Sequence, residues 1–271
     1  MSVSVIITVY CNTNTNYFME AFESIQSQSL KKKEIIVIVD GNLNSRLDAL
    51  LKKLSREKRL TLIKSEFNKG AGFARDLGIR NTNHDIIAIM DSDDISDKSR
   101  LMKQLNIIVK NKADVVGSNL TEFVKHTEDL RLERKVPKQH KKIKKLSKWR
   151  NPMNGASLMF RKKDYIQIGG YPHNAPFFED YALVLKFIEE GFRCFSIQEN
   201  LLYARTNKDW ITRRSGYSYL LAEFKHLNWM YKKRYINIFE YFLNIIIKST
   251  LRLFPSVILK IIYSNLLRSK K

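Results

Sequence analysis

The stretch IIAIMDSDD, residues 86–94, joins a run of apolar residues to Asp91, Asp93 and Asp94, with Ser92 between the first two. A short, β-branched apolar run is typical of a buried strand. Like charges packed into so short a span repel one another unless a cation or the protons of a ligand compensate them. The stretch therefore predicts a buried strand that ends at a cation or ligand site, in a chain whose formal net charge is +21.

The composition limits the classes of protein to consider. With 271 residues, 44% of them hydrophobic, the chain can bury one sizeable core and carry a smaller appended region. A pI near 9.9 predicts polyanionic partners, namely nucleic acid, an acidic membrane surface or phosphorylated small molecules. Cys11 and Cys194 lie far apart without a CxxC pair, which argues against a disulfide framework or a zinc knuckle and favours a reducing cytoplasm.

Strand-like and helix-like segments alternate along the first half of the chain. Short β-branched runs lie at residues 3–9, 34–39, 60–64, 85–90 and 114–117. Longer segments with one polar face lie at residues 17–28, 45–58, 71–81 and 97–111. This order predicts an α/β fold with a parallel sheet covered by helices on both faces, and such sheets bind ligands outside the carboxyl ends of their strands.

The expected carboxyl ends carry polar side chains. The first strand ends in Thr8, Val9 and Tyr10, the second ends in Asp40, and the fourth ends in the three aspartates. A carboxylate there can accept a hydrogen bond from a base or ribose, and two carboxylates one residue apart can hold a divalent cation. The alternative is that these aspartates form turns and cap helices, which is the stronger interpretation for Asp40 taken alone.

A glycine-rich helix start, NKGAGFARDLGI at residues 68–79, follows the third expected strand. Gly70 and Gly72 allow the backbone to approach a ligand closely, the free N–H groups of the helix favour an anion, and Arg75 adds a fixed charge. The segment is neither a GxGxxG fingerprint nor a P-loop. It fits a phosphate or nucleotide contact, although such a helix start taken alone is more often structural.

Six segments, among them the strand ends and the glycine-rich helix start described above, follow one another in the chain. They are VSVIITVY (3–10), IVDG (38–41), NKGAGFARDLGI (68–79), IIAIMDSDD (86–94), NPMNGASLMFRKKDYIQIGGYP (151–172) and FFEDYALVLKFIEEGF (177–192). Their order over residues 1–205 resembles a family 2 glycosyltransferase with the GT-A fold. The resemblance is to bacterial enzymes that build O-antigen or capsular polysaccharide on a lipid diphosphate carrier.

The resemblance implies a GT-A (Rossmann-like), mostly parallel sheet flanked by helices, with a C-terminal amphipathic helical extension. It divides the chain into a catalytic domain, 1–205, and an extension, 206–271. Within the catalytic domain, 1–118 would bind the nucleotide sugar and 119–205 the acceptor. The chain departs from the family pattern at Asp76, where Asn is more common.

The resemblance also assigns roles to the polar residues at the strand ends. Those that would contact the nucleotide sugar are Thr8, Val9, Tyr10, Asp40, Gly70, Arg75, Asp91, Ser92 and Asp93. The first three would line the uracil pocket, and Asp40 would bond the uracil edge. Asp91 and Asp93 form the DxD motif that holds Mn²⁺ or Mg²⁺ on the diphosphate, and Asp94 either shares this metal or caps the next helix.

An inverting reaction also needs a general base, because the acceptor hydroxyl must lose its proton as the sugar is displaced from behind. Asp180 matches the base of the family, and Glu179 would orient the acceptor or the base. The alternative is that both acidic residues interact with the dipole at a helix start. Asn154 and Gly155, earlier in the chain, would contact the acceptor.

The basic and aromatic C-terminal part predicts where the protein works. Residues 131–150 carry ten Lys and Arg against one Glu, and residues 206–271 combine basic, apolar and aromatic side chains. Glu240, Lys248 and Arg252 make a membrane span in this part costly, so we expect helices that lie on an anionic membrane surface. The alternative is a helical pair packed on the catalytic domain or in a dimer. The first interpretation places the protein peripherally on the cytoplasmic face of a bacterial inner membrane.

These expectations combine into a metal-dependent, inverting hexosyltransferase. Its donor would be UDP-galactose or UDP-glucose, and its acceptor a saccharide linked to undecaprenyl diphosphate. Its partners would be these substrates, the anionic inner membrane and a second copy in a homodimer, without nucleic acid. Two alternatives stay open, a nucleic-acid-binding protein or metal-dependent nuclease, and a non-catalytic relative that binds sugar nucleotides. The sequence does not decide the donor sugar, the linkage or the metal.

Overall fold

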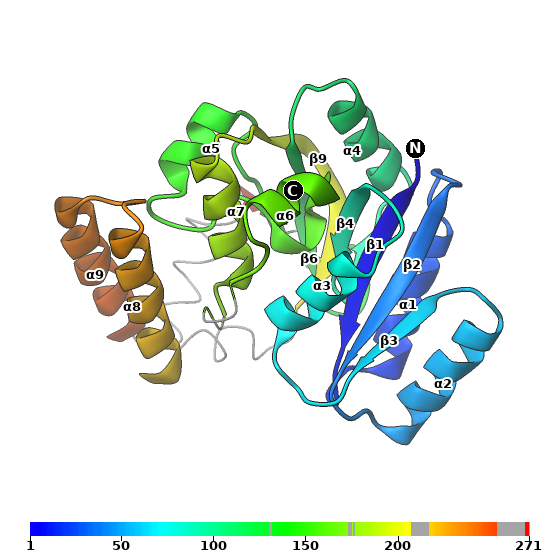
Figure 1. The fold of residues 1–271 in the computed structure, drawn as a ribbon. Helices are drawn as coiled ribbons and strands as arrows, with labels where there is room; N and C mark the ends of the chain where they lie inside the picture. Colours follow the sequence, from blue (N-terminus) through cyan, green and yellow to red (C-terminus); the bar gives the residue numbers. More distant parts are fainter. Residues whose placement is uncertain (130–131, 173–174, 176, 207–216, 254–268, 271) are drawn as a thin grey trace.

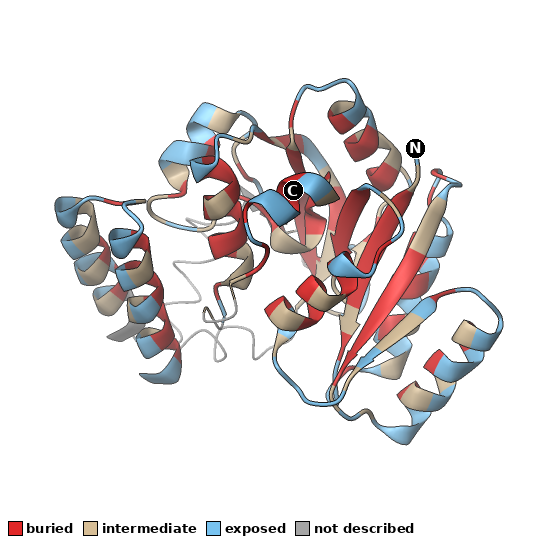
Figure 2. Cartoon of the chain, in the orientation of Figure 1, coloured by how far each residue is buried: buried red, intermediate tan, exposed pale blue. Residues whose placement is uncertain are grey.

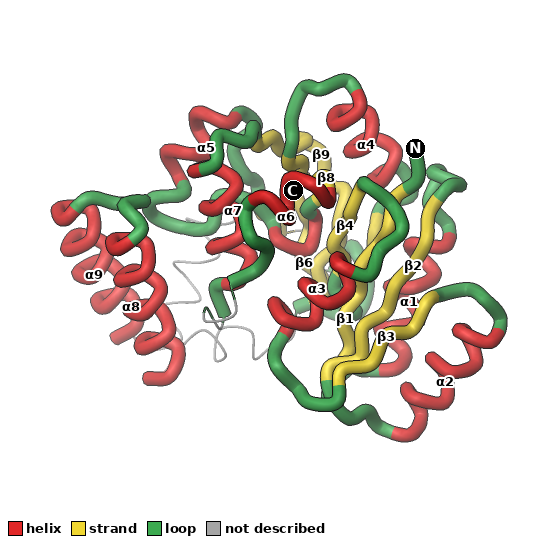
Figure 3. Tube along the Cα trace, viewed as in Figure 1, coloured by secondary structure: helices red, strands yellow, loops and turns green. Residues whose placement is uncertain are grey.

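The computed structural model describes residues 1–271 except 130–131, 173–174, 176, 207–216, 254–268 and 271, and it describes only the backbone at 251–253 and 269–270. The described chain forms one central sheet with helices on both faces (Figure 1). Figure 3 shows the strands running side by side through the middle of the molecule, with the helices outside them. The predicted α/β class is confirmed.

The first half alternates strands and helices as predicted. Its elements are β1 Val3–Val9, α1 Thr15–Gln26, β2 Lys33–Asp40, α2 Ser45–Arg56, β3 Thr61–Ser65, α3 Ala71–Arg80, β4 Ile86–Met90, β5 Ile95–Ser96, α4 Arg100–Val109 and β6 Val115–Phe123. Only β6 extends well beyond its predicted end at residue 117. Its polar residues Ser118, Asn119, Thr121 and Glu122 are buried where β6 pairs with β7 and β9, a burial that hydropathy alone does not indicate.

The second half adds shorter strands and a pair of long helices. Its elements are β7 Leu132–Arg134, α5 His140–Leu146, a 3-10 turn at Gly155–Ser157, β8 Met159–Arg161, α6 Lys162–Gln167, α7 Glu179–Glu189, β9 Cys194–Arg205, α8 Tyr217–Lys232, α9 Ile238–Leu253 and β10 Ser269–Lys270. The sheet order is β10-β7-β6-β8-β4-β1-β2-β3. The strands are parallel from β3 to β4, whereas β8 runs antiparallel between β4 and β6, so the sheet is mixed beyond β4.

Alternating side chains of β1 enter two separate cores. Val5 and Ile7 pack on the face covered by α1, α2 and α4, while Ile6 packs on the face covered by α3, α6 and α7. Phe18 and Phe22, one helical turn apart on α1, are fully buried, and burial of such a side chain contributes roughly 1.5–3 kcal/mol. Because both faces of the central strands are covered, only their ends are open to a ligand.

The C-terminal helix α8 shares an apolar cluster with α7, and α9 packs against α8 (Figure 1). Phe178, Tyr181 and Leu185 of the α7 region share an apolar cluster with side chains of α8. Lys148 and Glu240 form an ion pair of 2.6 Å that joins α9 to the segment after α5. This packing matches the second interpretation of the extension, whose residues 207–216 and 254–268 lie outside the described part.

The outer face of α9 is apolar and exposed. Figure 2 shows exposed residues along this outermost helix, and the large apolar ones are Ile238, Phe239, Phe242, Ile246 and Ile247. Within the described ranges, no helix is both long and apolar enough to cross a membrane.

Candidate active site

Arg75 lies at the centre of the polar residues that follow the parallel strands. It projects from α3 and donates one hydrogen bond to Oδ1 of Asp91, at 2.6 Å, and another to Oδ1 of Asp180, at 2.9 Å. Its side chain is only 8% exposed. Burial opposes the charge, but Asp180, Tyr171 and Asp91 outweigh burial and raise the pKa of Arg75 well above its usual value. The guanidinium is thus a permanent cation shared by two carboxylates.

Asp180, in the first turn of α7, approaches the backbone of Gly155 closely. Its Oδ1 also accepts a hydrogen bond from the Tyr171 hydroxyl, at 3.0 Å. A Cβ atom at Gly155 would lie only 2.1 Å from Oδ2 of Asp180. Gly155 therefore belongs to the site because it leaves room for this carboxylate. The structure brings together two residues that the sequence placed in separate roles.

Glu179 is half-buried beside the start of α3. A Cβ atom at Gly72 would lie 2.9 Å from Cγ of Glu179, so the absence of a side chain there allows α3 and α7 to meet. Burial, followed by the charge of Asp180, raises the pKa of the Glu179 carboxyl above its usual value. Glu179 thus lies next to Asp180 in surroundings that disfavour its own ionised form.

Asp40 anchors the loop that precedes α3. The carboxylate is 4% exposed, and its two oxygens accept the backbone N–H groups of Lys69 and Gly70, each at 2.9 Å. Gly70 has φ +92, and a Cβ atom there would meet nothing within 4 Å. Asp40 therefore holds the glycine loop in place, and the space above Gly70 is open. The predicted contact of Asp40 with uracil stays a prediction.

Asp76 points away from Arg75. It accepts hydrogen bonds from the Tyr165 hydroxyl at 2.6 Å and from Nε of Arg80 at 2.7 Å. Asp76, which stands where Asn is more common in the family, therefore has two hydrogen-bond partners of its own.

The three aspartates of the acidic motif face different surroundings. The Asp91 side chain is 39% exposed, and Asp93 is exposed as well. Asp94 is buried, accepts the backbone N–H of Arg205 at 2.9 Å, and has a pKa raised well above its usual value by burial and then by Asp91 and Asp93. This contact holds the end of β9, and Asp94 does not cap the next helix, α4, whose N-cap is Ser99. A share of Asp94 in the metal stays a prediction.

The described part of the chain contains no group of three or more His, Cys, Asp or Glu side chains that could hold a metal ion by themselves. Asp91 and Asp93 still supply the hard oxygen ligands that Mn²⁺ or Mg²⁺ takes, and such ions commonly complete their coordination with phosphate and water. The residues present therefore fit a divalent cation that arrives with a diphosphate.

Two arginines that the sequence did not single out support this loop. Arg205, at the end of β9, donates from Nε to the backbone oxygen of Asp93 at 2.9 Å. Its guanidinium lies over the rings of Tyr17 and Phe123, at 4.0 and 4.4 Å from their centres. Arg100 is fully buried and donates to two backbone oxygens, and burial lowers its pKa to about 10. The only sequence signal for a buried cation near this loop was the cluster of three aspartates that precedes Arg100.

The remaining predicted residues divide by exposure. Tyr10 is 42% exposed and Thr8 is half-buried, whereas the Val9 side chain lies in the core and leaves only its backbone to a ligand. Ser92 is half-buried within the acidic loop. Asn154 is 1% exposed and donates to the backbone oxygen of Ser118 at 2.7 Å, a bond that supports β6. Its contact with an acceptor stays a prediction.

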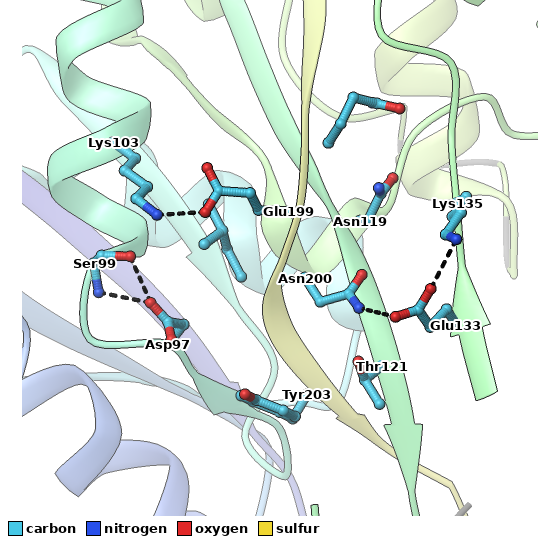
Figure 4. Close-up of a pocket in the computed structure, with 12 residues that line it drawn as sticks. Asp97, Ser99, Lys103, Asn119, Thr121, Glu133, Lys135, Glu199, Asn200 and Tyr203 are labelled. Atoms are coloured by element: carbon cyan, nitrogen blue, oxygen red, sulfur yellow. Dashed lines mark hydrogen bonds and ion pairs between the residues drawn. The ribbon is translucent and has the colours of Figure 1, made fainter. Parts of the chain in front are cut away.

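A separate hollow of about 490 Å³ lies over β6, β7 and β9, and none of the predicted site residues lines it (Figure 4). Four of its charged side chains pair with one another, Lys103 with Glu199 and Lys135 with Glu133 at 3.0 Å. The carboxylate of Asp97, which also lines the hollow, accepts hydrogen bonds from Ser99.

An acidic pair, Asp91 and Asp93, thus follows β4, and Arg75 joins Asp91 to Asp180 at the start of α7 in a mixed α/β sheet with a GT-A-like fold. The chain belongs to glycosyl transferase family 2, whose family model matches residues 4–170. The chain is therefore a glycosyltransferase. This family membership argues against the two alternatives of a nuclease and a nucleic-acid-binding protein.

Three known proteins illustrate the similarity. An Escherichia coli protein named UDP-Gal:alpha-D-GlcNAc-diphosphoundecaprenol beta-1,3-galactosyltransferase is 31% identical over 266 residues, which are 98% of this chain and 96% of that protein. Staphylococcus aureus TarS 1-349 in complex with UDP-GlcNAc aligns with a TM-score of 0.64 at 16% identity, over 84% of this chain and 66% of that one. The Pyrobaculum calidifontis mannosyltransferase PcManGT, in complex with GDP-Man and Mn²⁺, aligns with a TM-score of 0.60 at 18% identity, over 83% and 60%. The chain thus spans two thirds or less of these two structures, which share its fold.

Proposed function

We propose that this protein transfers galactose or glucose from a UDP-sugar to a saccharide on undecaprenyl diphosphate, with inversion, during synthesis of a bacterial surface polysaccharide. The observation that carries the proposal is the bridge from Asp91 through Arg75 to Asp180, at 2.6 and 2.9 Å. It holds a donor-side carboxylate and the candidate base on one buried cation. The name of the Escherichia coli relative supports both the donor and the acceptor class.

Asp91 and Asp93 would hold a Mn²⁺ or Mg²⁺ ion together with the diphosphate. When bound, such an ion neutralises the charge that develops as the nucleotide diphosphate departs. The open space above Gly70 and the N-terminus of α3 suit the negatively charged donor, because free N–H groups there favour anions. The Mn²⁺ in the mannosyltransferase complex supports this assignment.

Asp180 would accept the proton of the acceptor hydroxyl. Its side chain is 26% exposed, so a substrate can reach it, and the absence of a side chain at Gly155 leaves room for its Oδ2. A positioned base of this kind contributes roughly 10²–10⁴-fold to the rate. Inversion would require the base and the departing diphosphate to act on opposite faces of the sugar.

The outer face of α9 and the basic helix α5 would bind the anionic inner membrane from the cytoplasmic side. Phe239, Phe242 and Ile246 lie on one exposed stripe of α9. The ion pair between Lys148 and Glu240 holds the end of the basic segment beside that helix. An apolar stripe next to Lys-rich surface is the pattern of helices that lie in a membrane interface. Such docking would bring the site close to a lipid-linked acceptor.

The proposed reaction is tested by thermal shift and turnover together. We expect UDP with Mn²⁺ to raise the Tm, and one UDP-sugar of a panel to raise it further, because binding to the folded state alone stabilises it. Asp180→Asn should keep this shift while kcat collapses. A Tm that responds to single-stranded DNA and not to UDP with Mn²⁺ would contradict the proposal, and normal kcat in Asp180→Asn would remove the base.

A further inference from the structure

We propose that Tyr171 is a positioning residue that, with Arg75, holds Oδ1 of Asp180 so that Oδ2 is the oxygen that accepts the acceptor's proton. The inference rests on the proposed function, because it concerns the base of that reaction. It assigns to Tyr171 a role that the motif alone does not indicate.

The two oxygens of Asp180 have different surroundings. Oδ1 accepts the Tyr171 hydroxyl at 3.0 Å and Nη1 of Arg75 at 2.9 Å. Oδ2 accepts no hydrogen bond from any residue that the structure describes, and it lies against the backbone of Gly155. Two donors that approach one oxygen from different elements prevent the carboxylate from rotating about its last bond. They also draw electron density to Oδ1, which leaves Oδ2 as the proton acceptor.

Burial, a backbone hydrogen bond and a contact with Arg75 fix the position of Tyr171. Its side chain is buried, and its backbone N–H donates to the Tyr165 hydroxyl at 3.0 Å. The Tyr165 hydroxyl in turn donates to Asp76 of α3 at 2.6 Å. The Arg75 guanidinium lies 5.9 Å from the centre of the Tyr171 ring. Burial raises the pKa of Tyr171 well above its usual value, so its hydroxyl keeps the proton that it donates.

The chemical step is a single displacement. The acceptor O–H bond breaks and its proton goes to Oδ2 of Asp180, while the acceptor oxygen forms a bond to the anomeric carbon. The bond from that carbon to the diphosphate breaks, and its electron pair leaves with UDP. Oδ2 must face the acceptor throughout, because a rotated carboxylate would present an oxygen that already accepts two hydrogen bonds.

Tyr171→Phe tests the assignment, with Tyr181→Phe as the matched control. Tyr181 is also buried, lies on the helix that carries Asp180, and donates its hydroxyl to the backbone oxygen of Ser147 instead. We expect Tyr171→Phe to lower kcat roughly tenfold or more, as loss of a positioned base does, with KM for the UDP-sugar unchanged. Tyr181→Phe should leave kcat unchanged. Equal kcat in both variants would overturn the inference.

A double-mutant cycle separates this inference from the proposed function. In an Asp180→Asn background, measured by single turnover with excess enzyme, Tyr171→Phe should cause no further loss, because residues that act as a unit are not additive. An undiminished further loss would mean that Tyr171 acts elsewhere. Full turnover in Asp180→Asn alone would overturn the proposed base itself.

A second variant covers the case in which Tyr171→Phe does not fold. Tyr165→Phe removes the hydroxyl that accepts the Tyr171 N–H and donates to Asp76, and it leaves the Tyr171 hydroxyl in place. It should lower kcat by a smaller factor, again without effect in the Asp180→Asn background. If Tyr171→Phe does not fold and Tyr165→Phe keeps the wild-type kcat, the positioning role of Tyr171 is contradicted.

Discussion

Gly155 lies directly beneath the Asp180 carboxylate, and its missing side chain allows the two to approach. The contact is one of several at which single residues set the geometry of the site. Arg75 reaches two carboxylates because a guanidinium carries several donors in a fixed plane. At this scale one cation, one hydroxyl and one glycine surround the Asp180 carboxylate.

Gly155→Ala should displace Asp180 and lower kcat roughly tenfold or more, because the new Cβ would lie 2.1 Å from Oδ2. The affinity for UDP, measured by calorimetry, should change little. Gly117→Ala is the control, since its Cβ would meet the flexible end of Met153 at 3.1 Å. A kcat in Gly155→Ala that equals that of the control would show that Asp180 tolerates the shift.

At the scale of elements, the position of α7 depends on α8 as well as on the sheet. His226 of α8 stacks on Phe178 at 4.8 Å and lies beside the rings of Tyr181 and Trp229. Phe178 directly precedes the acidic start of α7. Helix α8 therefore packs against the helix that carries the candidate base and stabilises its position.

His226 predicts how this packing responds to acid. Burial, aided by the charge of Lys248, lowers its pKa to about 3, and Lys248 in turn pairs with Glu223 at 3.4 Å. Because the unfolded chain binds a proton below about pH 6.5 and the folded chain does not, the contribution of His226 to stability is complete above that pH and is lost as the pH falls toward 3. The contribution of His226 to the free energy of unfolding should fall by at most about 1.4 kcal/mol per pH unit in that range.

His226→Phe should flatten this part of the profile, because Phe keeps the ring contacts and binds no proton. The measurement is urea unfolding at several pH values between 7.5 and 4. His126→Gln, at an exposed site, is the control and should follow the wild-type profile. An unchanged slope in His226→Phe would assign the acid sensitivity to other groups.

At the scale of the whole molecule, the net charge of +21 and the apolar stripe of α9 occur on the same protein. Self-association through that stripe would bring two cationic surfaces together, whereas an anionic membrane would attract them. Charge therefore favours lipid over a second copy as the occupant of this face.

Replacement of Phe239, Phe242 and Ile246 by Ser should weaken binding to vesicles that contain phosphatidylglycerol by roughly tenfold or more, since each large buried apolar side chain contributes about 1.5–3 kcal/mol. Flotation with and without the anionic lipid measures it, and added salt should weaken wild-type binding. The control replaces Val109 and Ile166, exposed apolar residues of α4 and α6, by Ser. Unchanged binding of the triple variant would place the anchor elsewhere, with residues 131–150 next.

The residues that could be predicted from sequence are those whose role depends on local pattern. Apolar runs and turn residues located the strands of the first half, and the rule for parallel sheets placed Asp40, Asp91 and Asp93 at one edge. The family resemblance added Asp180 and Gly155. Each of these positions follows from neighbours in the chain or from a motif, and the structure draws Arg75, Asp91 and Asp180 into one cluster.

Contacts between distant segments were decided only by the tertiary structure. Arg75 and Asp180 are 105 positions apart, and neither periodicity nor spacing indicates that one cation joins the acidic motif to the candidate base. The inward turn of Asp94 toward Arg205, the burial of Asn154 and the hydroxyl of Tyr171 on Oδ1 depend in the same way on packing across the sheet. Sequence by itself determined the elements and the chemistry at their ends, because both are local. The partners of each side chain were decided by the fold, because long-range contacts arise only when the whole core is packed.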